Sequence, residues 1–362
     1  MKIIQMLPEL KEGGVERGVV DINKALIKAG VTSIIMSNGG KLAEQITKDG
    51  GEHIKFDLAS KNIFSVIWRV WKLKKLLKSI NPDIIHVRSR VPAWLVYLAN
   101  KNLKIKVVST VHGLNSPNFY SKIMIKADAI ITPSNCVKEH IIKYFDTDTN
   151  LITVVPRGVD LSAFDPSNLD AEFINEFRQK YKILKDDFVI SNIGRITELK
   201  DYETFIKATN ELKKIKKVKA LIVGGVHPRK QKYYQSLKDL ISNLGLENEV
   251  IFTGSQSKIA EIYSISNVVV SSSKKPESFG RSVAEALALN TPVVASNHGG
   301  VKDIIINAKF GYFFEIGDFK GLCDKILLAN ELKFDGFKYI KNNFSFKQMF
   351  DKTMEIYTRI IE

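Results

Sequence analysis

Glu277-Ser-Phe-Gly-Arg-Ser-Val-Ala-Glu285, followed directly by Ala-Leu-Ala-Leu-Asn-Thr-Pro-Val-Val-Ala295, is the most informative stretch of this chain. A Phe-Gly turn opens an apolar helix, and the run Pro292–Ala295 after it is typical of a buried strand. The two glutamates lie a little over two helical turns apart at about 3.6 residues per turn, so both carboxylates can face one side. They could accept hydrogen bonds from two sets of hydroxyls, while N–H groups at the helix start meet an anion. The same spacing is found between ordinary solvated helix charges.

The succession of helix and short apolar run recurs along the whole chain. Expected strands are Lys2–Leu7, Thr32–Met36, Ile84–Val87, Lys106–Thr110, Ala129–Thr132 and Ile152–Val155, then Phe188–Ile193, Lys219–Val223, Val250–Phe252, Val268–Ser271, Pro292–Ala295 and Gly311–Phe314. Helical patterns lie between most of them. This alternation predicts an α/β fold with parallel sheets, because parallel strands need crossover connections.

The alternation occurs twice, and the break between the two series falls at Pro156–Asn168, where Pro, Gly and Asp cluster. A chain of 362 residues is also too long for one ordinary core. We therefore expect two doubly wound domains in tandem. Ligands of such sheets bind beyond the carboxyl ends of the strands, so two facing domains would form one cleft.

Composition limits the class of protein. Hydrophobic content of 44% and charged content of 26% are typical of a globular protein. Cys136 and Cys323 stand far apart, which gives neither a disulfide framework nor metal-ligand spacing. The N-terminus has no signal-peptide pattern and no apolar run approaches the ~20 residues that span a bilayer, so a cytoplasmic location is expected.

The net charge of +15 favours an anionic partner. No nucleic-acid-binding motif is present, so nucleic acid is not the expected partner. An anionic membrane surface and a phosphorylated glycan remain, although a lysine-rich composition also arises from an AT-rich genome. Neither half contains a Gly-x-Gly-x-x-Gly or P-loop signature, which disfavours a dinucleotide oxidoreductase and a P-loop kinase.

Three loops after expected strands carry residues suited to a phosphorylated ligand. Gly13-Gly14-Val-Glu16-Arg17 opens a helix, so its backbone N–H groups can approach a phosphate. His112-Gly113 stands at the carboxyl end of a strand, where the imidazole could contact a sugar hydroxyl. In Gly194-Arg195-Ile-Thr-Glu-Leu-Lys200-Asp201, two cations could hold a diphosphate and neutralise a leaving group. The plainer interpretations are a βα turn, a packed histidine and a solvated basic loop.

The segment Ile63–Ile80 is basic and amphipathic, and no acid interrupts it between Asp57 and Asp83. Its apolar positions at helical spacing are Ile63, Val66, Ile67, Val70, Leu73 and Leu77, its second apolar edge is Phe64, Trp68 and Trp71, and its charge comes from Lys61, Arg69, Lys72, Lys74, Lys75 and Lys78. The pattern is that of an interfacial helix on anionic lipid and equally that of a core-packed crossover helix with a solvated basic face.

Asp146-Thr-Asp148 has the form of an Asp-x-Asp pair that binds a metal-bound sugar nucleotide in a different transferase fold. Here it lies in a polar run after the expected helix Lys138–Phe145. We interpret it as a loop, and no metal site is expected.

Taken in their order along the chain, these motifs resemble the retaining glycosyltransferases of the GT-B fold, specifically glycosyltransferase family 4. Pro156-Arg-Gly-Val-Asp160 resembles the inter-domain segment of that family, which more often contains Asn-Gly-Val-Asp. His298-Gly-Gly-Val-Lys-Asp303 resembles its Gly-Gly-x-x-Glu run, with Asp303 in place of the glutamate. The resemblance covers nearly the whole chain.

The resemblance implies two Rossmann-like doubly wound domains that face each other across a cleft. The N-terminal acceptor domain would comprise residues 1–165 and 345–362, because the last helix, Phe346–Ile361, would cross back to it. Residues 166–344 would form the C-terminal domain that holds a nucleotide-sugar donor.

The resemblance also assigns site residues. Arg195 and Lys200 would contact the diphosphate, Glu285 the ribose hydroxyls and Glu277 the hydroxyls of the donor sugar. His112 would meet that sugar from the first domain. The implied catalytic set is His112, Arg195, Lys200 and Glu277, and the implied substrate-binding set is Gly13, Gly14, Arg195, Lys200, Glu277, Ser278, Phe279, Gly280 and Glu285.

The implied reaction is transfer of a hexose-type sugar from a UDP- or GDP-sugar, with retained configuration and without a metal or cofactor. The acceptor would be membrane-associated: a lipopolysaccharide or polysaccharide lipid intermediate, or a glycolipid acceptor such as diacylglycerol. Attachment to the inner face of the cytoplasmic membrane is an option within the expected location. The alternatives are a sugar-nucleotide epimerase of the same fold and a non-catalytic nucleotide-sugar or membrane-binding module.

Overall fold

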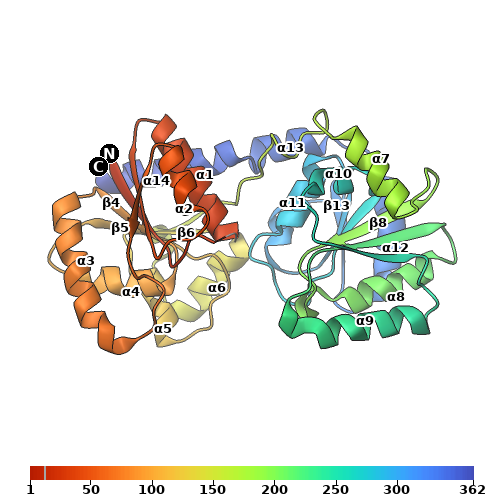
Figure 1. Cartoon of the computed structure of the whole chain (residues 1–362), viewed down its shortest axis with the longest axis horizontal. Helices are drawn as coiled ribbons and strands as arrows, with labels where there is room; N and C mark the ends of the chain where they lie inside the picture. The colour runs from red at the N-terminus through yellow and green to blue at the C-terminus, as the bar shows by residue number, and fades with distance from the viewer. Residues whose placement is uncertain (12–13) are drawn as a thin grey trace. The chain divides into compact units, whose positions relative to one another are not determined.

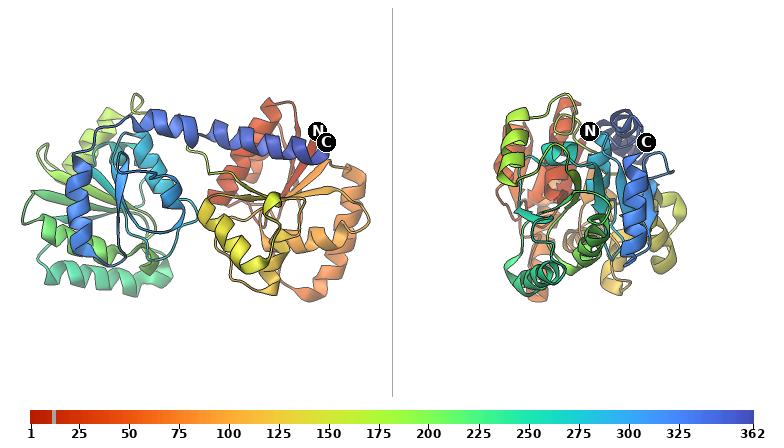
Figure 2. Two further views of the ribbon diagram at one scale, coloured as in Figure 1. Left: turned by 180° about the vertical axis from the view of Figure 1, so that it is seen from behind. Right: turned by 90° about the vertical axis from the view of Figure 1, so that its right-hand side faces the viewer.

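The computed structural model describes residues 1–11 and 14–362, so Gly13 lies outside the described residues. The chain divides into two compact units, one of Met1–Pro156 with Met349–Glu362 and one of Arg157–Gln348. Each unit contains one parallel sheet with helices on both of its faces (Figure 1, Figure 2). The predicted α/β class with two doubly wound sheets is confirmed.

The seven-stranded sheet of the first unit has the order β3-β2-β1-β4-β5-β6-β7. Its strands are β1 Lys2–Met6, β2 Thr32–Ser37, β3 Glu52–Lys55, β4 Ile84–Val87, β5 Lys106–Thr110, β6 Ala129–Thr132 and β7 Ile152–Val154. Ile4 of β1 is in register with Ile34 of β2 on one side and Ile85 of β4 on the other. The strand order reverses between β1 and β4, so the loops that follow these two strands diverge there and leave room for a ligand.

The six-stranded sheet of the second unit has the order β10-β9-β8-β11-β12-β13. Its strands are β8 Phe188–Ile193, β9 Val218–Val223, β10 Val250–Gly254, β11 Val268–Ser271, β12 Val293–Ser296 and β13 Gly311–Phe314. The order reverses between β8 and β11, which brings the loops after these strands next to each other.

Helices cover both faces of each sheet through buried apolar clusters. The first unit contains α1 Gly14–Lys28, α2 Ala43–Lys48, α3 Val66–Ile80, α4 Arg90–Ala99, α5 Phe119–Lys122 and α6 Asn135–Phe145; the second contains α7 Ala171–Lys180, α8 Tyr202–Leu212, α9 Gln231–Asn243, α10 Ile259–Ser264, α11 Arg281–Ala288, α12 Phe319–Asn330 and α13 Gly336–Asn343; α14 is Phe346–Ile361. In the first unit α3, α4 and α6 share one core and α1 and α2 another. In the second, α8, α9 and α12 pack on one face and α10, α11 and α13 on the other.

The end of α14 is anchored on the sheet of the first unit by a buried polar chain. The Tyr357 hydroxyl lies 2.5 Å from Nδ1 of His86 on β4, and Nε2 of the same ring lies 2.6 Å from Oγ1 of Thr110. Burial, helped by the charges of Arg88 and His112, lowers the pKa of His86 well below its ordinary value, so the ring is neutral at physiological pH.

All expected strands are present, with ends that differ by at most two residues. The structure adds β3, Glu52–Lys55, which was not predicted from the sequence. This short edge strand carries polar and charged side chains and no fully buried residue, so it lacks the apolar run that marks the other strands.

The buried side of α3 differs from what the charge pattern suggests. Arg69, counted among the charged residues of this segment, is only 2% exposed, whereas Ile63 and Ile67, which share the helical spacing of Leu73 and Leu77, are 72% and 83% exposed. The buried face of α3 runs through Leu73 and Leu77, and Arg69 is one turn before Leu73 on the same face. Its guanidinium donates hydrogen bonds to backbone carbonyls of the segment before the helix, those of Asp57, Ser60 and Asn62.

Candidate active site

The loops after β8 and β11 bring together two of the expected site residues. Lys200 Nζ lies 2.5 Å from Glu277 Oε1, and the Ser273 hydroxyl donates to the same oxygen at 2.5 Å. Both charged side chains are largely buried, at 25% and 21% exposure. The contact joins residues 77 positions apart, and it follows from the adjacency of β8 and β11 at the point where the strand order reverses.

The loop of Lys200 is fixed by hydrogen bonds on both sides. The Ser272 hydroxyl donates to the Lys200 carbonyl at 2.7 Å and accepts from Asn192 Nδ2 at 2.8 Å. The Tyr202 hydroxyl donates to the Gly194 carbonyl at 2.7 Å. A side chain at Gly194 would come within 2.9 Å of the Lys200 side chain, so the glycine leaves room for the lysine to reach Glu277.

The Glu277 loop is held from the other side by a glycine pair. A Cβ at Gly299, whose φ is +80°, would lie 2.7 Å from the Glu277 nitrogen, and one at Gly300 would lie 2.7 Å from Phe279 Cα. The Gly300 N–H donates to the Glu277 carbonyl at 2.7 Å. Only glycine allows this approach, which gives the Gly-Gly motif after His298 a structural reason.

The carboxyl of Glu277 is ionised. Burial alone would raise its pKa, but the charge of Lys200, the hydrogen bonds from Lys200 and Ser273, and the nearby His298 together hold the pKa below its ordinary value. Lys200 and Glu277 are therefore a true ion pair.

The pKa of Glu285 is shifted in the opposite direction. The residue lies in α11, and burial raises its pKa to about 7, although the charge of Arg281 and a 3.1 Å hydrogen bond from the Tyr263 hydroxyl oppose that rise. Only Glu285 belongs to the helix, since α11 begins at Arg281, one residue after Gly280 with a φ of +102°. Loop contacts place Glu277, so its position does not follow from helical spacing.

The remaining residues expected at the donor site are Arg195, Ser278, Phe279 and Gly280. Arg195 is on the Lys200 loop and is exposed to solvent. Ser278 is half-buried, whereas the Phe279 side chain is only 3% exposed and packs in the apolar cluster of α11. Gly280 is required by its left-handed backbone, and a Cβ there would lie 2.5 Å from the Val301 side chain.

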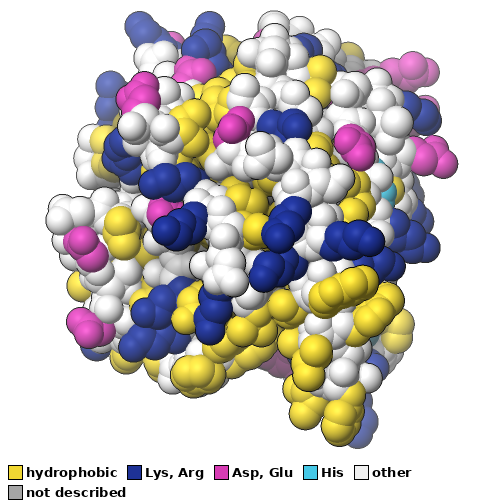
Figure 3. All heavy atoms as spheres, turned by 90° about the vertical axis from the view of Figure 1, so that its left-hand side faces the viewer, with side chains coloured by type: hydrophobic (Ala, Val, Ile, Leu, Met, Phe, Trp, Pro, Cys, Tyr) yellow, Lys and Arg dark blue, Asp and Glu magenta, His cyan; other side chains and the backbone are white. Residues whose placement is uncertain are grey.

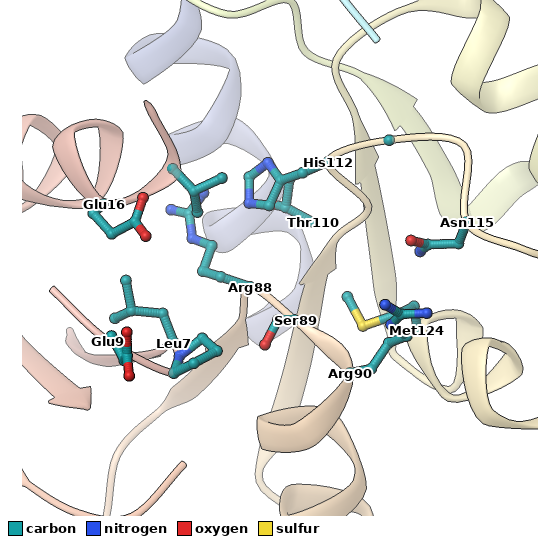
Figure 4. A pocket seen from close by; sticks show the side chains of 13 residues that line it. Leu7, Glu9, Glu16, Arg88, Ser89, Arg90, Thr110, His112, Asn115 and Met124 are labelled. Atoms are coloured by element: carbon teal, nitrogen blue, oxygen red, sulfur yellow. The ribbon is translucent and has the colours of Figure 1, made fainter. Parts of the chain in front are cut away.

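The first unit has a pocket of about 320 Å³ at the carboxyl ends of β1, β4 and β5 (Figure 4). Its lining comprises Leu7, Pro8, Glu9, Val15, Glu16, Arg88, Ser89, Arg90, Thr110, His112, Gly113, Asn115 and Met124. His112 and Gly113 were expected at such a position, and Gly14 is the first residue of the adjoining helix α1.

Several polar residues of both regions were not predicted from the sequence. Ser273 and Tyr263 meet the two glutamates only through the fold. Arg88 and Arg90 could have been predicted, because the run Arg-Ser-Arg directly follows a buried strand. His112-Gly113 was predicted from a similar position, two residues after a strand.

Within residues 1–11 and 14–362, no group of three or more His, Cys, Asp or Glu side chains is arranged to hold a metal ion. The Asp146-Thr-Asp148 run is a loop: Asp146 ends α6 in a left-handed conformation, and Asp148 accepts a hydrogen bond from the Asn150 N–H. The helices of the described ranges include none long and apolar enough to cross a membrane.

The two parallel sheets match the GT-B fold of glycosyltransferases, and two family models match the chain. The model described as glycosyl transferases group 1 matches residues 173–343, and that of glycosyltransferase family 4 matches residues 12–163. The crystal structure of a glycosyltransferase from Rickettsia africae is 34% identical, with a TM-score of 0.91, and the alignment covers 100% of this chain and 98% of that one. The chain belongs to glycosyltransferase family 4. The predicted enzyme class, a glycosyltransferase of a retaining, metal-independent family, is thereby confirmed.

Other similar proteins are more distant. Capsular polysaccharide biosynthesis glycosyltransferase CapM of Staphylococcus aureus is 27% identical over 100% of this chain and 98% of its own length. Alpha-monoglucosyldiacylglycerol synthase of Streptococcus pneumoniae is 28% identical over 71% of this chain, and the alignment spans 62%, less than two thirds, of that protein. Anabaena HepE, crystallised with UDP and glucose, has the same fold with a TM-score of 0.81 at 21% identity, over 99% of this chain and 100% of its own.

Proposed function

We propose that this protein transfers a hexose-type sugar from a nucleoside diphosphate sugar to a membrane-associated acceptor, with retained configuration and without a metal ion. The observation that supports it most directly is the Lys200–Glu277–Ser273 cluster at the point where the strand order of the second sheet reverses. It combines a cation for a diphosphate with an ionised acceptor for sugar hydroxyls, within one hydrogen-bonded unit.

In the proposed donor site, residues 166–344 hold the nucleotide sugar. Arg195 and Lys200 bind the diphosphate, Glu277 binds hydroxyls of the donor sugar, and Glu285 binds the ribose. The backbone of Ser278–Gly280 lines the sugar and phosphate. Lys200 already pairs with Glu277, so the bound donor shares this lysine between the carboxylate and a phosphate oxygen.

The proposed chemistry is displacement on one face of the sugar. As the anomeric bond breaks, positive charge develops on the sugar and negative charge on the diphosphate, which Arg195 and Lys200 stabilise. A diphosphate oxygen accepts the proton of the acceptor hydroxyl, so the products are the glycosylated acceptor and a nucleoside diphosphate. In the acceptor domain, residues 1–165 with 345–362, His112 contacts the sugar and Gly14 approaches the diphosphate and acceptor.

The donor assignment is tested by thermal shift with UDP, GDP and ADP and with their sugars, followed by product analysis with the donors that stabilise the protein. The expected result is a rise in melting temperature with one nucleotide, because a ligand at about 100 times its Kd adds about 2.7 kcal/mol to the stability. UDP-glucose is the first sugar donor to test, since HepE was crystallised with UDP and glucose. Conversion of the free donor to an isomeric sugar nucleotide without acceptor would identify the epimerase instead. Absence of stabilisation by any nucleotide would contradict the donor site.

The outward side of α3 and the turn before it supports a membrane-associated acceptor. Its large apolar side chains are Ile63, Phe64, Ile67, Trp68 and Trp71, with exposed fractions of 72%, 89%, 83%, 59% and 62%. They recur at helical spacing and form one continuous stripe. Figure 3 shows hydrophobic side chains gathered on this face of the first unit, with Lys and Arg side chains beside them.

Charge adjoins the stripe in a way that suits anionic lipid. Lys72 Nζ lies 4.7 Å from the ring centroid of Trp68, and Lys75 Nζ lies 5.8 Å from that of Trp71. Exposed aromatic rings with adjacent lysines are the features of an interfacial helix, in which rings enter the headgroup region and ammonium groups meet phosphates. Two relatives bear names that refer to diacylglycerol and to capsular polysaccharide, which agrees with such an acceptor.

Vesicle sedimentation tests this surface with phosphatidylglycerol–phosphatidylcholine vesicles against phosphatidylcholine alone. Replacing Lys72, Lys74, Lys75 and Lys78 together with Gln should abolish the salt-sensitive binding, because each lysine near an anionic surface contributes roughly 1 kcal/mol. The matched control replaces Lys207, Lys232, Lys238 and Lys302 of the second unit and should bind as the wild type does. Equal binding by both variants would make α3 an ordinary crossover helix.

A further inference from the structure

The pocket of the first unit contains two arginines that are not part of the proposed donor site. Arg88 follows β4, and Arg90 is the first residue of α4. The pocket has a volume of about 320 Å³, at the lower end of the ~300–1,000 Å³ usual for small-molecule sites. Its polar side chains therefore decide which small group it accepts.

Arg88 and Ser89 have unmet hydrogen-bonding capacity in this pocket. Arg88 Nη2 donates to Gln5 Oε1 at 2.5 Å, but its Nε is buried and has no hydrogen-bond partner among the described residues. The Ser89 hydroxyl is buried and equally unpaired within that part of the chain. No carboxylate of residues 1–11 or 14–362 forms an ion pair with Arg88. A buried unpaired polar group costs about 1–3 kcal/mol, so a ligand that pairs with these two is favoured.

The start of α4 adds to the same end of the pocket. Ser89 is the N-cap residue of this ten-residue helix, and its side chain makes no capping hydrogen bond; Pro92, the third helical residue, has no N–H to donate to it. The first N–H groups of a helix favour an anion. Arg90 is held in place nearby, because its guanidinium lies 5.3 Å from the ring centroid of Tyr120 and Nη1 donates to the Ser121 hydroxyl at 3.2 Å.

The opposite side of the pocket has the opposite chemistry. In Figure 4, Glu9 and Glu16 stand on one side, Arg90 and Asn115 on the other, and Arg88 and Ser89 between them. Carboxylates accept hydrogen bonds from hydroxyls and repel anions, so they suit the neutral part of a polyol. One ligand can thus place its hydroxyls toward the glutamates and an anionic group toward Arg88.

We propose that this pocket selects an acceptor that carries an oxyanion group, a phosphate or a carboxylate, within a few atoms of its hydroxyls. Arg88, the Ser89 hydroxyl and the N-terminus of α4 bind the oxyanion, and Glu9 and Glu16 bind hydroxyls. The inference rests on the proposed glycosyl transfer, for which it names the chemistry of the acceptor.

Calorimetric titration with three probes that share a three-carbon skeleton tests this site: glycerol 3-phosphate, glycerate and glycerol. Titrations are run with and without UDP, which occupies the donor loops. We expect glycerol 3-phosphate or glycerate to bind at least tenfold more tightly than glycerol. Arg88→Gln should remove that preference, and Arg229→Gln, which changes an exposed arginine of the second unit, should keep it. Equal binding of all three probes, or an undiminished preference in Arg88→Gln, would overturn the proposal.

Two further variants keep the test decisive if Arg88→Gln does not fold. Arg88→Lys retains the charge without the planar guanidinium, and Ser89→Ala removes only the hydroxyl. Each should lower the affinity for the anionic probe by a smaller factor of about three to ten. Unchanged affinity in both would also overturn the proposal. A soluble short-chain phosphatidylglycerol, titrated below its micelle concentration, distinguishes the sources: binding through Arg88 identifies a lipid headgroup, and binding of the soluble anions alone identifies a free acceptor.

The outcome is separable from that of the donor screen. If UDP and the other nucleotides fail to bind, the proposed transfer is wrong, while the three probes still show whether the arginine pocket selects an oxyanion.

Discussion

Glu277 and Glu285 lie eight positions apart in one stretch of chain, yet their pKa values are shifted in opposite directions. Both are largely buried, and burial raises the pKa of each. Lys200 and Ser273 reverse that effect for Glu277, whereas Arg281 and Tyr263 only reduce it for Glu285, whose pKa is about 7. A directly bonded cation, and not depth of burial alone, therefore determines which of the two carboxyls has a lowered pKa in this site.

The largest effect is expected when Lys200, the cation that pairs with Glu277, is removed. Lys200→Ala should lower kcat/KM for the donor by at least about 30–150-fold, which is ~2–3 kcal/mol of transition-state stabilisation, because the leaving diphosphate loses one charge. The variant also abolishes the interaction that opposes burial at Glu277. Its pKa should therefore rise, and the acid limb of the kcat/KM profile should move to higher pH.

Two controls separate this effect from a general loss of charge. Lys207→Ala, an exposed lysine of α8 in the same lysine-rich unit, should retain wild-type turnover. Arg195→Ala changes an exposed residue and should lose rate with little loss of stability. Near-normal turnover in both Lys200→Ala and Arg195→Ala would exclude the diphosphate clamp, and an unchanged acid limb would break the contrast between the two glutamates.

The fold was largely predictable because its signals are local. A buried parallel strand is a short apolar run wherever it occurs, so only β3, polar and at the edge, was missed. The same reasoning did not identify the buried side of α3, because both of its sides carry apolar residues. Periodicity shows that a helix has two such stripes, but not which one packs against the sheet or that Arg69 lies beneath it.

The candidate site was predictable in its residue types and not in their pairing. The contact between Lys200 and Glu277 depends on β8 lying next to β11, which is a property of strand order rather than of either loop. The pKa of Glu285 is raised by burial in the fold, and the hydroxyl of Tyr263, 22 positions away, only reduces that rise. Expected roles for the two glutamates could be stated from the sequence, but their pKa values required the neighbours that the fold supplies.

The smaller expected effect concerns Glu285 and tests whether its raised pKa contributes to the stability of the fold. Its folded-state pKa of about 7 lies above the ordinary 4.5, so the fold favours the neutral carboxyl. The stabilisation associated with this proton is complete below about pH 4.5 and is lost as the pH rises through about 7. A shift of this size corresponds to about 3 kcal/mol at most, and the remaining solvent contact of the Glu285 side chain reduces the expected loss to roughly 1–2 kcal/mol.

Glu285→Gln removes the titrating group and should flatten this pH dependence. Urea unfolding at about pH 5 and about pH 8 measures it, with exposed Glu355→Gln as the matched control that should follow the wild type. Circular dichroism or hydrogen exchange is the suitable readout, because Trp68, Trp71 and Trp94 are all in the first unit and their fluorescence does not report on α11. If wild type and Glu285→Gln lose stability in parallel between these pH values, Glu285 is already ionised in the folded protein. The Tyr263 hydroxyl and Arg281 would then outweigh burial there, as Lys200 does at Glu277.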